Sequence, residues 1–123
     1  MEKIYIAHSR DFDFKRDLYD PIRKSNLNSR YDFILPHETD QFFHSKEVIK
    51  KSQLVVAEVS FPATGEGIEL GWADSFSVPI VCLYKEGMKP SGSINAVTNN
   101  IIPYTDSTDM LKKLEMFLSQ RIS

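Results

Sequence analysis

Cysteine, net charge and long apolar runs are all scarce in this sequence. Its one cysteine, Cys82, excludes an internal disulfide, and its place in the apolar stretch IVCLY favours a buried strand residue over a nucleophile. A formal net charge of −2 gives no electrostatic preference for nucleic acid. No apolar run approaches the ~20 residues that a membrane span needs. We therefore expect a soluble protein that binds neither nucleic acid nor membranes.

Several functional patterns are also absent. In GEGIELG, residues 65–71, the third glycine stands one position too late for the G-x-G-x-x-G fingerprint of dinucleotide-binding proteins. The G-K-S/T of a phosphate-loop NTPase is absent as well. Three histidines, His8, His37 and His44, show no metal-ligand spacing. We therefore expect neither a metal nor an organic cofactor. The chain opens on the strand-like KIYIA without a signal-peptide pattern, which favours a cytoplasmic location.

What the sequence does contain is an alternation of apolar and helix-like segments. At 123 residues, 41% hydrophobic and 26% charged, the composition suits a single globular domain over residues 1–123. Continuous apolar stretches rich in β-branched and aromatic residues predict buried strands. These stretches are residues 3–7, 31–36, 54–60, 79–84 and a short one within 99–104.

Helices are predicted between these strands. Phe14, Leu18 and Ile22 recur every four residues, and Pro21 should kink or shorten their helix because proline has no N–H to donate. Asp106 or Ser107 can cap a final helix. The inner face of this final helix is formed by Met110, Leu111, Leu114, Phe117 and Leu118. A helix over residues 45–52 turns Val48 and Ile49 inward. A helix over residues 67–76 carries Ile68, Trp72 and Phe76 on one stripe.

Continuously apolar strands that alternate with helices indicate a parallel sheet covered on both faces. The predicted fold is a three-layer α/β/α, flavodoxin-like domain with about five parallel strands. Ligands bind such sheets outside the carboxyl ends of the strands. The segments to inspect are therefore residues 8–10, 36–38, 60–69, 85–93 and 104–106.

Glu69 is the most informative residue near these ends. Gly65 and Gly67 permit a tight turn and a close approach of a ligand to the backbone. A helix that begins at Gly67 would place Glu69 in its first turn, where the helix dipole favours a carboxylate and attracts anions. Position alone leaves two interpretations, an ordinary first-turn acid or a carboxylate that acts on an electron-poor sugar carbon.

Beyond position, residues 55–87, VVAEVSFPATGEGIELGWADSFSVPIVCLYKEG, resemble the core of the nucleoside 2-deoxyribosyltransferase family. The resemblance is closest to its 2′-deoxynucleoside 5′-phosphate N-hydrolase branch, and it covers residues 48–96 best. It implies cleavage of the N-glycosidic bond of a small-molecule substrate, a (deoxy)nucleoside or a nucleoside 5′-monophosphate, by hydrolysis or by transfer to a second base. Glu69, in the ELG tripeptide, falls on the family's catalytic glutamate, which attacks the anomeric carbon and forms a glycosyl-enzyme intermediate.

The resemblance also implies roles for residues around the phosphate and the carboxylate. Tyr5 matches a strand tyrosine that lies near the catalytic glutamate. Ser9 matches a serine of a phosphate-binding turn, and Arg10 lies one position away from an arginine of that turn. In the same turn His8 replaces a glycine, and Asp11 would repel phosphate. A serine hydroxyl and a guanidinium both suit a phosphate.

Further matches concern the glycine-rich turn and a neighbouring subunit. Gly65 and Gly67 match the turn before the catalytic helix, and Thr64 offers a hydroxyl beside Ala63, which replaces a phosphate-contacting serine. Ser93 matches a serine that reaches across a dimer interface, so the resemblance implies a homodimer or higher homo-oligomer. His37 or Glu38 would border the nucleobase.

One departure from the family concerns an aspartate that helps to hold the sugar. Its place falls on Ser45, eight residues before Gln53, and Asp40, His44 and Glu47 are not in register with it. Two alternatives stay open, and the substitution supports the first of them. One is a non-catalytic nucleotide-binding or signalling module with a layout similar to Toll/interleukin-receptor domains, and the other is an NAD glycohydrolase.

Overall fold

The structure, a computed structural model, describes residues 1–41 and 43–121, and within them five parallel strands form one sheet of order β2-β1-β3-β4-β5. The strands are Lys3–His8 (β1), Asp32–Ile34 (β2), Leu54–Glu58 (β3), Ile80–Lys85 (β4) and Ile101–Tyr104 (β5). β1 and β3 pair in register from Ile4 opposite Leu54 to His8 opposite Glu58. The predicted flavodoxin-like fold with a parallel sheet is confirmed.

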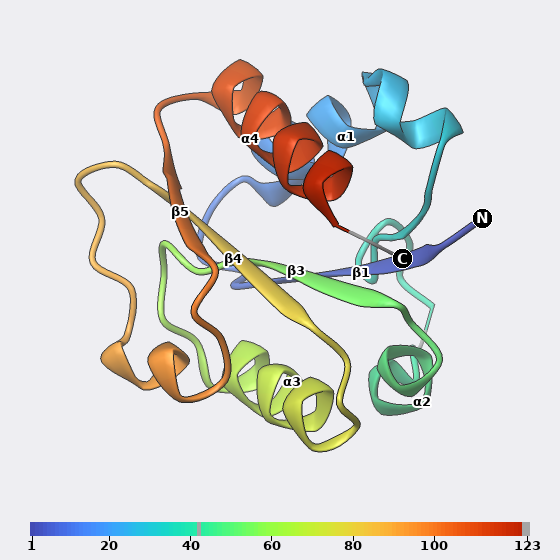
Figure 1. The fold of residues 1–123 in the computed structure, drawn as a ribbon, viewed down its shortest axis with the longest axis vertical. Coiled ribbons are helices and arrows are strands. Elements are labelled where there is room, and N and C mark those ends of the chain that lie inside the picture. Colours follow the sequence, from blue (N-terminus) through green and yellow to red (C-terminus); the bar gives the residue numbers. More distant parts are fainter. Residues whose placement is uncertain (42, 122–123) are drawn as a thin grey trace.

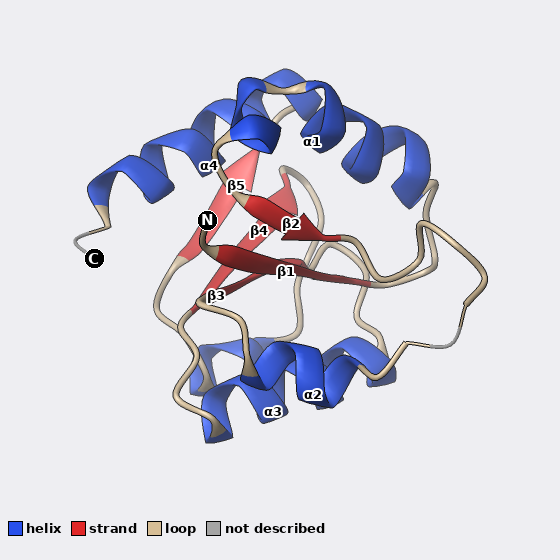
Figure 2. Cartoon of the chain, turned by 90° about the vertical axis from the view of Figure 1, so that its right-hand side faces the viewer, coloured by secondary structure: helices blue, strands red, loops and turns tan. Residues whose placement is uncertain are grey.

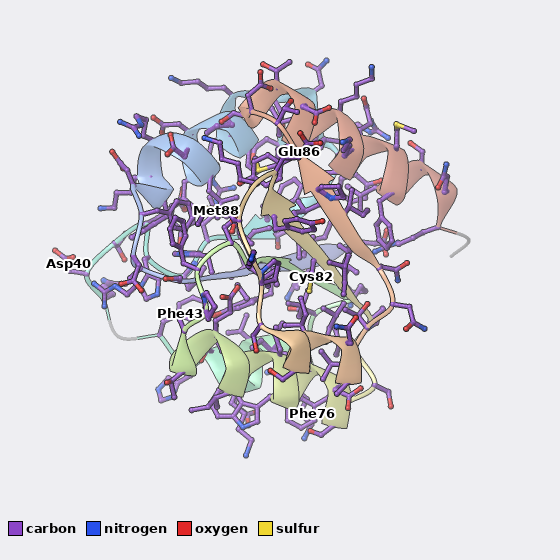
Figure 3. The ribbon with its side chains drawn as sticks, turned by 90° about the vertical axis from the view of Figure 1, so that its left-hand side faces the viewer. Asp40, Phe43, Phe76, Cys82, Glu86 and Met88 are labelled. Carbon is purple, nitrogen blue, oxygen red and sulfur yellow. The ribbon has the colours of Figure 1, made fainter. Side chains whose placement is uncertain are left out.

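Helices cover both faces of this sheet (Figures 1 and 2). Asp20–Lys24 (α1) and Ser107–Gln120 (α4) lie on one face, and Ser45–Lys50 (α2) and Thr64–Ser75 (α3) lie on the other. Alternate strand residues therefore enter different cores: Ile4 and Ile6 pack under α1 and α4, whereas Tyr5 and Ala7 pack on the side of α2 and α3. Cys82 is buried in β4, at the centre of the molecule, as predicted (Figure 3).

Pro21 changes the geometry of its helix, as predicted. A π-helical turn, Lys15–Tyr19 (η1), runs directly into α1, whose second residue is Pro21. Proline cannot donate the backbone bond that a regular helix needs there, and the turn that precedes it is π-helical. Leu18 and Ile22 are buried and Phe14 is half-buried, so the predicted face points to the core. A 3-10 turn, Asn26–Ser29 (η2), then leads to β2.

The last helix also follows the prediction. Asp106 caps it, because its Oδ1 accepts a hydrogen bond of 2.8 Å from the backbone N–H of Asp109. Met110, Leu114 and Leu118 are buried against the sheet. The loop between β4 and β5 contains a 3-10 turn, Gly92–Ala96 (η3).

The predicted start of α3 is wrong, and its predicted apolar stripe is confirmed only for Trp72 and Phe76, which pack against the core. The helix begins at Thr64, so Glu69 lies in its second turn, and Glu66 is the acid of its first turn. The residues that face the sheet are Glu66, Leu70 and Ala73, whereas Ile68 is 50% exposed and Trp72 and Phe76 are half-buried. The spacing of apolar residues did not predict this face because its first buried residue is a glutamate, Glu66.

Candidate active site

Tyr5 and Glu69 meet beneath the carboxyl end of β1. The phenol of Tyr5 donates a hydrogen bond of 2.6 Å to Oε2 of Glu69. Tyr5 is fully buried, and its ring lies 6.2 Å from that of Phe43. Burial, followed by the charge of Glu69, raises the pKa of Tyr5 far above its usual range. The phenol therefore keeps its proton and acts as a fixed donor to the carboxylate.

Glu69 itself is half-buried and has two hydroxyl groups beside it. Burial raises the pKa of its carboxyl group, and hydrogen bonds from Tyr5 and then Ser45 oppose that shift. Ser45 is the first residue of α2. The position at which the resemblance expects an aspartate is therefore beside Glu69, but it carries a neutral hydroxyl group in place of a second carboxylate.

A cavity of about 470 Å³ opens beside Glu69, and we call it the Glu69 cavity. Its volume lies within the range of small-molecule sites. Ser9, Arg10, His37, Gly65 and Glu69 all line it, so the structure brings together five of the residues predicted from sequence. The remaining lining residues are His8, Asp11, Ser45, Ala63, Glu66, Ile68 and Trp72.

The other predicted residues line an adjoining cavity of about 320 Å³, the Ser93 cavity. Thr64, Gly67 and Ser93 lie in its wall, where the Oγ atoms of Ser91 and Ser93 are 2.8 Å apart. Ser93 thus faces α3 of its own chain. Ala63 and Glu66 line both cavities, and they mark the junction between the two sets of predicted residues.

The predicted glycine turn before the catalytic helix is wrong in detail, because Gly65 and Gly67 lie inside the first turns of α3. A Cβ atom added to either glycine would meet no atom of the described residues within 4 Å. The start of α3 is therefore open, and the first N–H groups of a helix have no partner within it. An anion could approach the backbone here, where the helix dipole also favours it.

A hydrogen-bonded chain fixes the opposite wall of the Glu69 cavity. Nδ1 of the buried His8 lies 2.6 Å from the carbonyl oxygen of Ser9, to which it donates, so Nε2 accepts from the phenol of Tyr19 at 2.6 Å. The backbone N–H of His37 donates to the same phenol oxygen at 3.0 Å. Burial lowers the pKa of His8 to about 4, which keeps the ring neutral.

The chain through His8 ties the loops after β1 and β2 together, and sequence reasoning missed it. His8 is recognisable in the sequence only as a departure from a glycine, and nothing in the local pattern pairs it with Tyr19. Of the two candidates after β2, only His37 lines the cavity; Glu38 forms two hydrogen bonds of 2.8 Å with Arg23. Asp40 lies at the edge of the molecule (Figure 3).

Glu66 is the second residue of the site that sequence reasoning missed. It is 5% exposed, and its Oε2 has no hydrogen-bond partner among the described residues. Burial, then the nearby charges of Glu58 and Glu69, raises its pKa to about 9. At neutral pH the group is a carboxylic acid, able to donate a hydrogen bond as well as accept one.

Comparisons with curated proteins agree with the family resemblance. The 5-hydroxymethyl-dUMP N-hydrolase of Mus musculus is 42% identical over 48 residues, which are 37% of this chain and 28% of that protein. That of Tetraodon nigroviridis is 36% identical over 64 residues, or 49% of this chain and 45% of the relative. A putative 2′-deoxynucleoside 5′-phosphate N-hydrolase 1 of Trichoplax adhaerens is 26% identical over 91 residues, which are 68% of this chain and 63% of that protein.

These relatives fit the nucleoside 2-deoxyribosyltransferase family, so the resemblance noted from the sequence is confirmed. The matched segments span less than two thirds of each of these curated relatives. No protein-family model matches the chain.

Two solved structures share the fold. That of Clostridium botulinum CMP N-glycosidase superimposes with a TM-score of 0.68 at 22% identity, over 93% of this chain and 99% of the other. A conserved protein from Enterococcus faecalis V583 superimposes with a TM-score of 0.62 at 20% identity, over 95% of this chain and 99% of the other. Within residues 1–41 and 43–121, no helix is long and apolar enough to cross a membrane, and no group of three or more acidic, histidine or cysteine side chains could hold a metal ion.

Proposed function

We propose that this protein is an enzyme that breaks the N-glycosidic bond of a nucleoside 5′-monophosphate, with Glu69 as the nucleophile. The observation that carries the proposal is the hydrogen bond from the buried Tyr5 to Glu69 at the wall of a cavity of substrate size. The names of the relatives, all of them nucleotide N-hydrolases, support the same chemistry.

The reaction needs a carboxylate with one oxygen held and the other available. Tyr5 holds Oε2 of Glu69, which leaves Oε1 to attack the anomeric carbon while the electron pair of the breaking bond leaves with the base. The base takes up a proton, and a covalent ester between the sugar and Glu69 forms. Attack by water, which loses a proton, then releases the sugar phosphate and restores the carboxylate; attack by a second base would make the enzyme a transferase.

The two walls of the Glu69 cavity suggest how the substrate lies. Arg10 supplies a positive charge, and Ser9 lies beside it in the turn that follows β1, opposite the open start of α3. We place the phosphate between this turn and α3, because a guanidinium group and a helix N-terminus both favour an anion. The sugar then lies over Glu69 and the base lies towards His37.

The test is base release from a panel of deoxynucleosides, nucleoside 5′-monophosphates and NAD. We expect release from a monophosphate, and we expect Glu69→Gln to lower kcat by about 10³-fold or more, because the amide cannot act as the nucleophile. Glu86→Gln is the matched control, since Glu86 is exposed on the loop after β4 (Figure 3). Release that persists in Glu69→Gln, or no release from any nucleotide, would contradict the proposal.

The implied homo-oligomer is part of this proposal. If Ser93 serves the site of a neighbouring chain, light scattering should find a dimer or a larger species at the concentrations used for the assay. If the protein is a fully active monomer at those concentrations, Ser93 does not serve a neighbouring chain and lines only the cavity of its own chain.

A further inference from the structure

Glu66 differs from the other polar residues of the site because its burial is uncompensated. An unpaired polar group in a protein interior costs about 1–3 kcal/mol. Glu66 is 5% exposed, and its Oε2 meets no hydrogen-bond partner in residues 1–41 and 43–121. A buried group without a partner in the free protein is a candidate for a partner supplied by a ligand.

The position of Glu66 points to one part of the substrate. Glu66 precedes Glu69 by three residues on α3, so the two side chains lie on the same face, one turn apart. Glu66 is nearer the open start of the helix, and it lines both the Glu69 cavity and the Ser93 cavity. A sugar bound over Glu69 would therefore extend its 5′ side, with the phosphate, towards Glu66.

The charges around this junction favour a neutral Glu66 over an ionised one when a phosphate binds. Among the described residues that line the Glu69 cavity, Arg10 is the one Lys or Arg side chain, whereas Asp11 and Glu69 are acidic. The described residues that line the Ser93 cavity add hydroxyl groups from Thr64, Ser91 and Ser93, and no Lys or Arg. An ionised Glu66 would repel the phosphate, but a protonated one is a strong donor to it, as buried carboxylic acids are to other anions.

We propose that Glu66 donates a hydrogen bond from its protonated carboxyl group to a phosphate oxygen of the substrate, and so makes the site prefer a nucleotide to the matching nucleoside. This inference rests on the proposed function, because it assumes that a nucleotide occupies the Glu69 cavity. Rotation about the terminal bond of the side chain exchanges the two carboxyl oxygens, so either can present the proton.

Two substitutions of similar size separate the donor from the volume that it fills. Glu66→Gln keeps an N–H donor that cannot ionise, whereas Glu66→Leu removes donor and acceptor together. The probes are the four 2′-deoxynucleoside 5′-monophosphates and the four matching deoxynucleosides. Affinity is measured by calorimetry in a Glu69→Gln background, which prevents turnover, and kcat and KM of base release are measured with Glu69 intact.

We expect Glu66→Leu to weaken nucleotide binding by about 10- to 100-fold, the effect of losing a hydrogen bond to a charged group. Its affinity for the nucleosides should change by about twofold or less, and Glu66→Gln should keep nucleotide affinity close to that of the parent. A second readout does not depend on Glu66→Leu folding. With Glu69 intact, KM for the nucleotide should rise above about pH 9 and should not rise in Glu66→Gln, because the amide never acquires the repelling charge.

Three outcomes would overturn the inference. The first is an equal loss of nucleoside and nucleotide affinity in Glu66→Leu, which would assign the contact to the sugar. The second is unchanged affinity of Glu66→Leu for both kinds of ligand. The third is the same dependence of KM on pH in Glu66→Gln as in the parent. Failure of the proposed function looks different, because the parent enzyme would then release no base from any nucleotide. If it also bound none of them, both proposals would fall together.

Discussion

The two buried glutamates near the carboxyl end of the sheet, Glu58 and Glu66, have opposite surroundings. Glu58 ends β3 and is 2% exposed, and it accepts hydrogen bonds from the backbone N–H of Ser60 at 2.6 Å, from the Ser60 hydroxyl at 2.9 Å and from the phenol of Tyr104. The Ser60 hydroxyl in turn accepts from the backbone N–H of Lys85 at 2.8 Å. Glu66 is 5% exposed and has an oxygen without a partner in the described part of the chain.

The difference separates a structural carboxylate from a candidate ligand-binding one. Glu58 joins the carboxyl ends of β3, β4 and β5, since Ser60, Lys85 and Tyr104 follow or end those strands. Glu58 also lines a cavity, of about 440 Å³, but its hydrogen bonds compensate for its desolvation. Glu66 lies between two cavities with its desolvation uncompensated, which is the arrangement expected at functional sites. Burial alone would have ranked the two residues equally.

The largest expected effect is on stability, at Glu58. Glu58→Ala leaves the donors of Ser60 and Tyr104 without an acceptor, so we expect the free energy of unfolding to fall by about 3–5 kcal/mol. The same truncation at Glu66 should cost about 1 kcal/mol or less, because it also removes an unpaired buried acid. Urea denaturation monitored by circular dichroism measures both. Equal losses in the two variants would erase the distinction drawn between them.

The next effect concerns the pH dependence of stability. The pKa of Glu66 is about 9 in the folded protein, above its ordinary value of 4.5, so between these values the folded state holds a proton that the unfolded state has lost. Stability from this group is therefore complete below about pH 4.5 and is lost as the pH rises towards 9. Relative to Glu66→Gln, the native protein should lose about 2–4 kcal/mol between about pH 5 and pH 8.

Parallel denaturation curves of the native protein and Glu66→Gln across this range measure the difference directly. Other titrating groups contribute to both proteins and cancel in the comparison. A constant difference between the two curves would mean that Glu66 is ionised in the folded protein. That result would also remove the physical basis of its proposed role as a donor.

The fold was predictable because its signals are local and additive. Each strand is a continuous apolar run, and Asp106 precedes its helix in the pattern expected of a cap, so the elements and their parallel order followed from the sequence. The face of α3 was not predictable, since Glu66 contributes to the buried side and hydrophobic patterns count only apolar residues. The identity of Glu69 came from its resemblance to a family; its position in the helix was misjudged by one turn.

The site was predictable only in part, because its wall depends on contacts between distant segments. Ser9, Arg10 and His37 follow the ends of β1 and β2, and parallel topology alone brings those ends together. The bond from Tyr19 to His8 has no counterpart in local sequence, and neither does the place of Ser45 beside Glu69. Counting along the chain found Ser45 as a missing aspartate, and in the structure Ser45 lines the same cavity as Glu69 and influences the pKa of its carboxyl group.

A smaller effect is expected from Tyr5→Phe, which keeps the ring and removes the donor to Glu69. We expect kcat for base release to fall by about 10- to 100-fold with little change in KM, because the lost hydrogen bond acts on the nucleophilic carboxylate and not on the bound substrate. Since the hydrogen bond lowers the pKa of Glu69, its removal raises that pKa. The acidic limb of the kcat profile should therefore move to higher pH. A profile that does not move would show that Tyr5 only fills space.

The smallest expected effect comes from Ser45→Ala, the second donor to Glu69. Its influence on the pKa of Glu69 ranks below that of Tyr5, so we expect kcat to fall by about two- to tenfold and the acidic limb to move by less than in Tyr5→Phe. Ser75→Ala, at the exposed end of α3, is the matched control. Because both hydroxyls act on one carboxylate, the loss in Tyr5→Phe combined with Ser45→Ala should differ from the product of the single losses. A strictly multiplicative loss would mean that Ser45 acts on the substrate and not through Glu69.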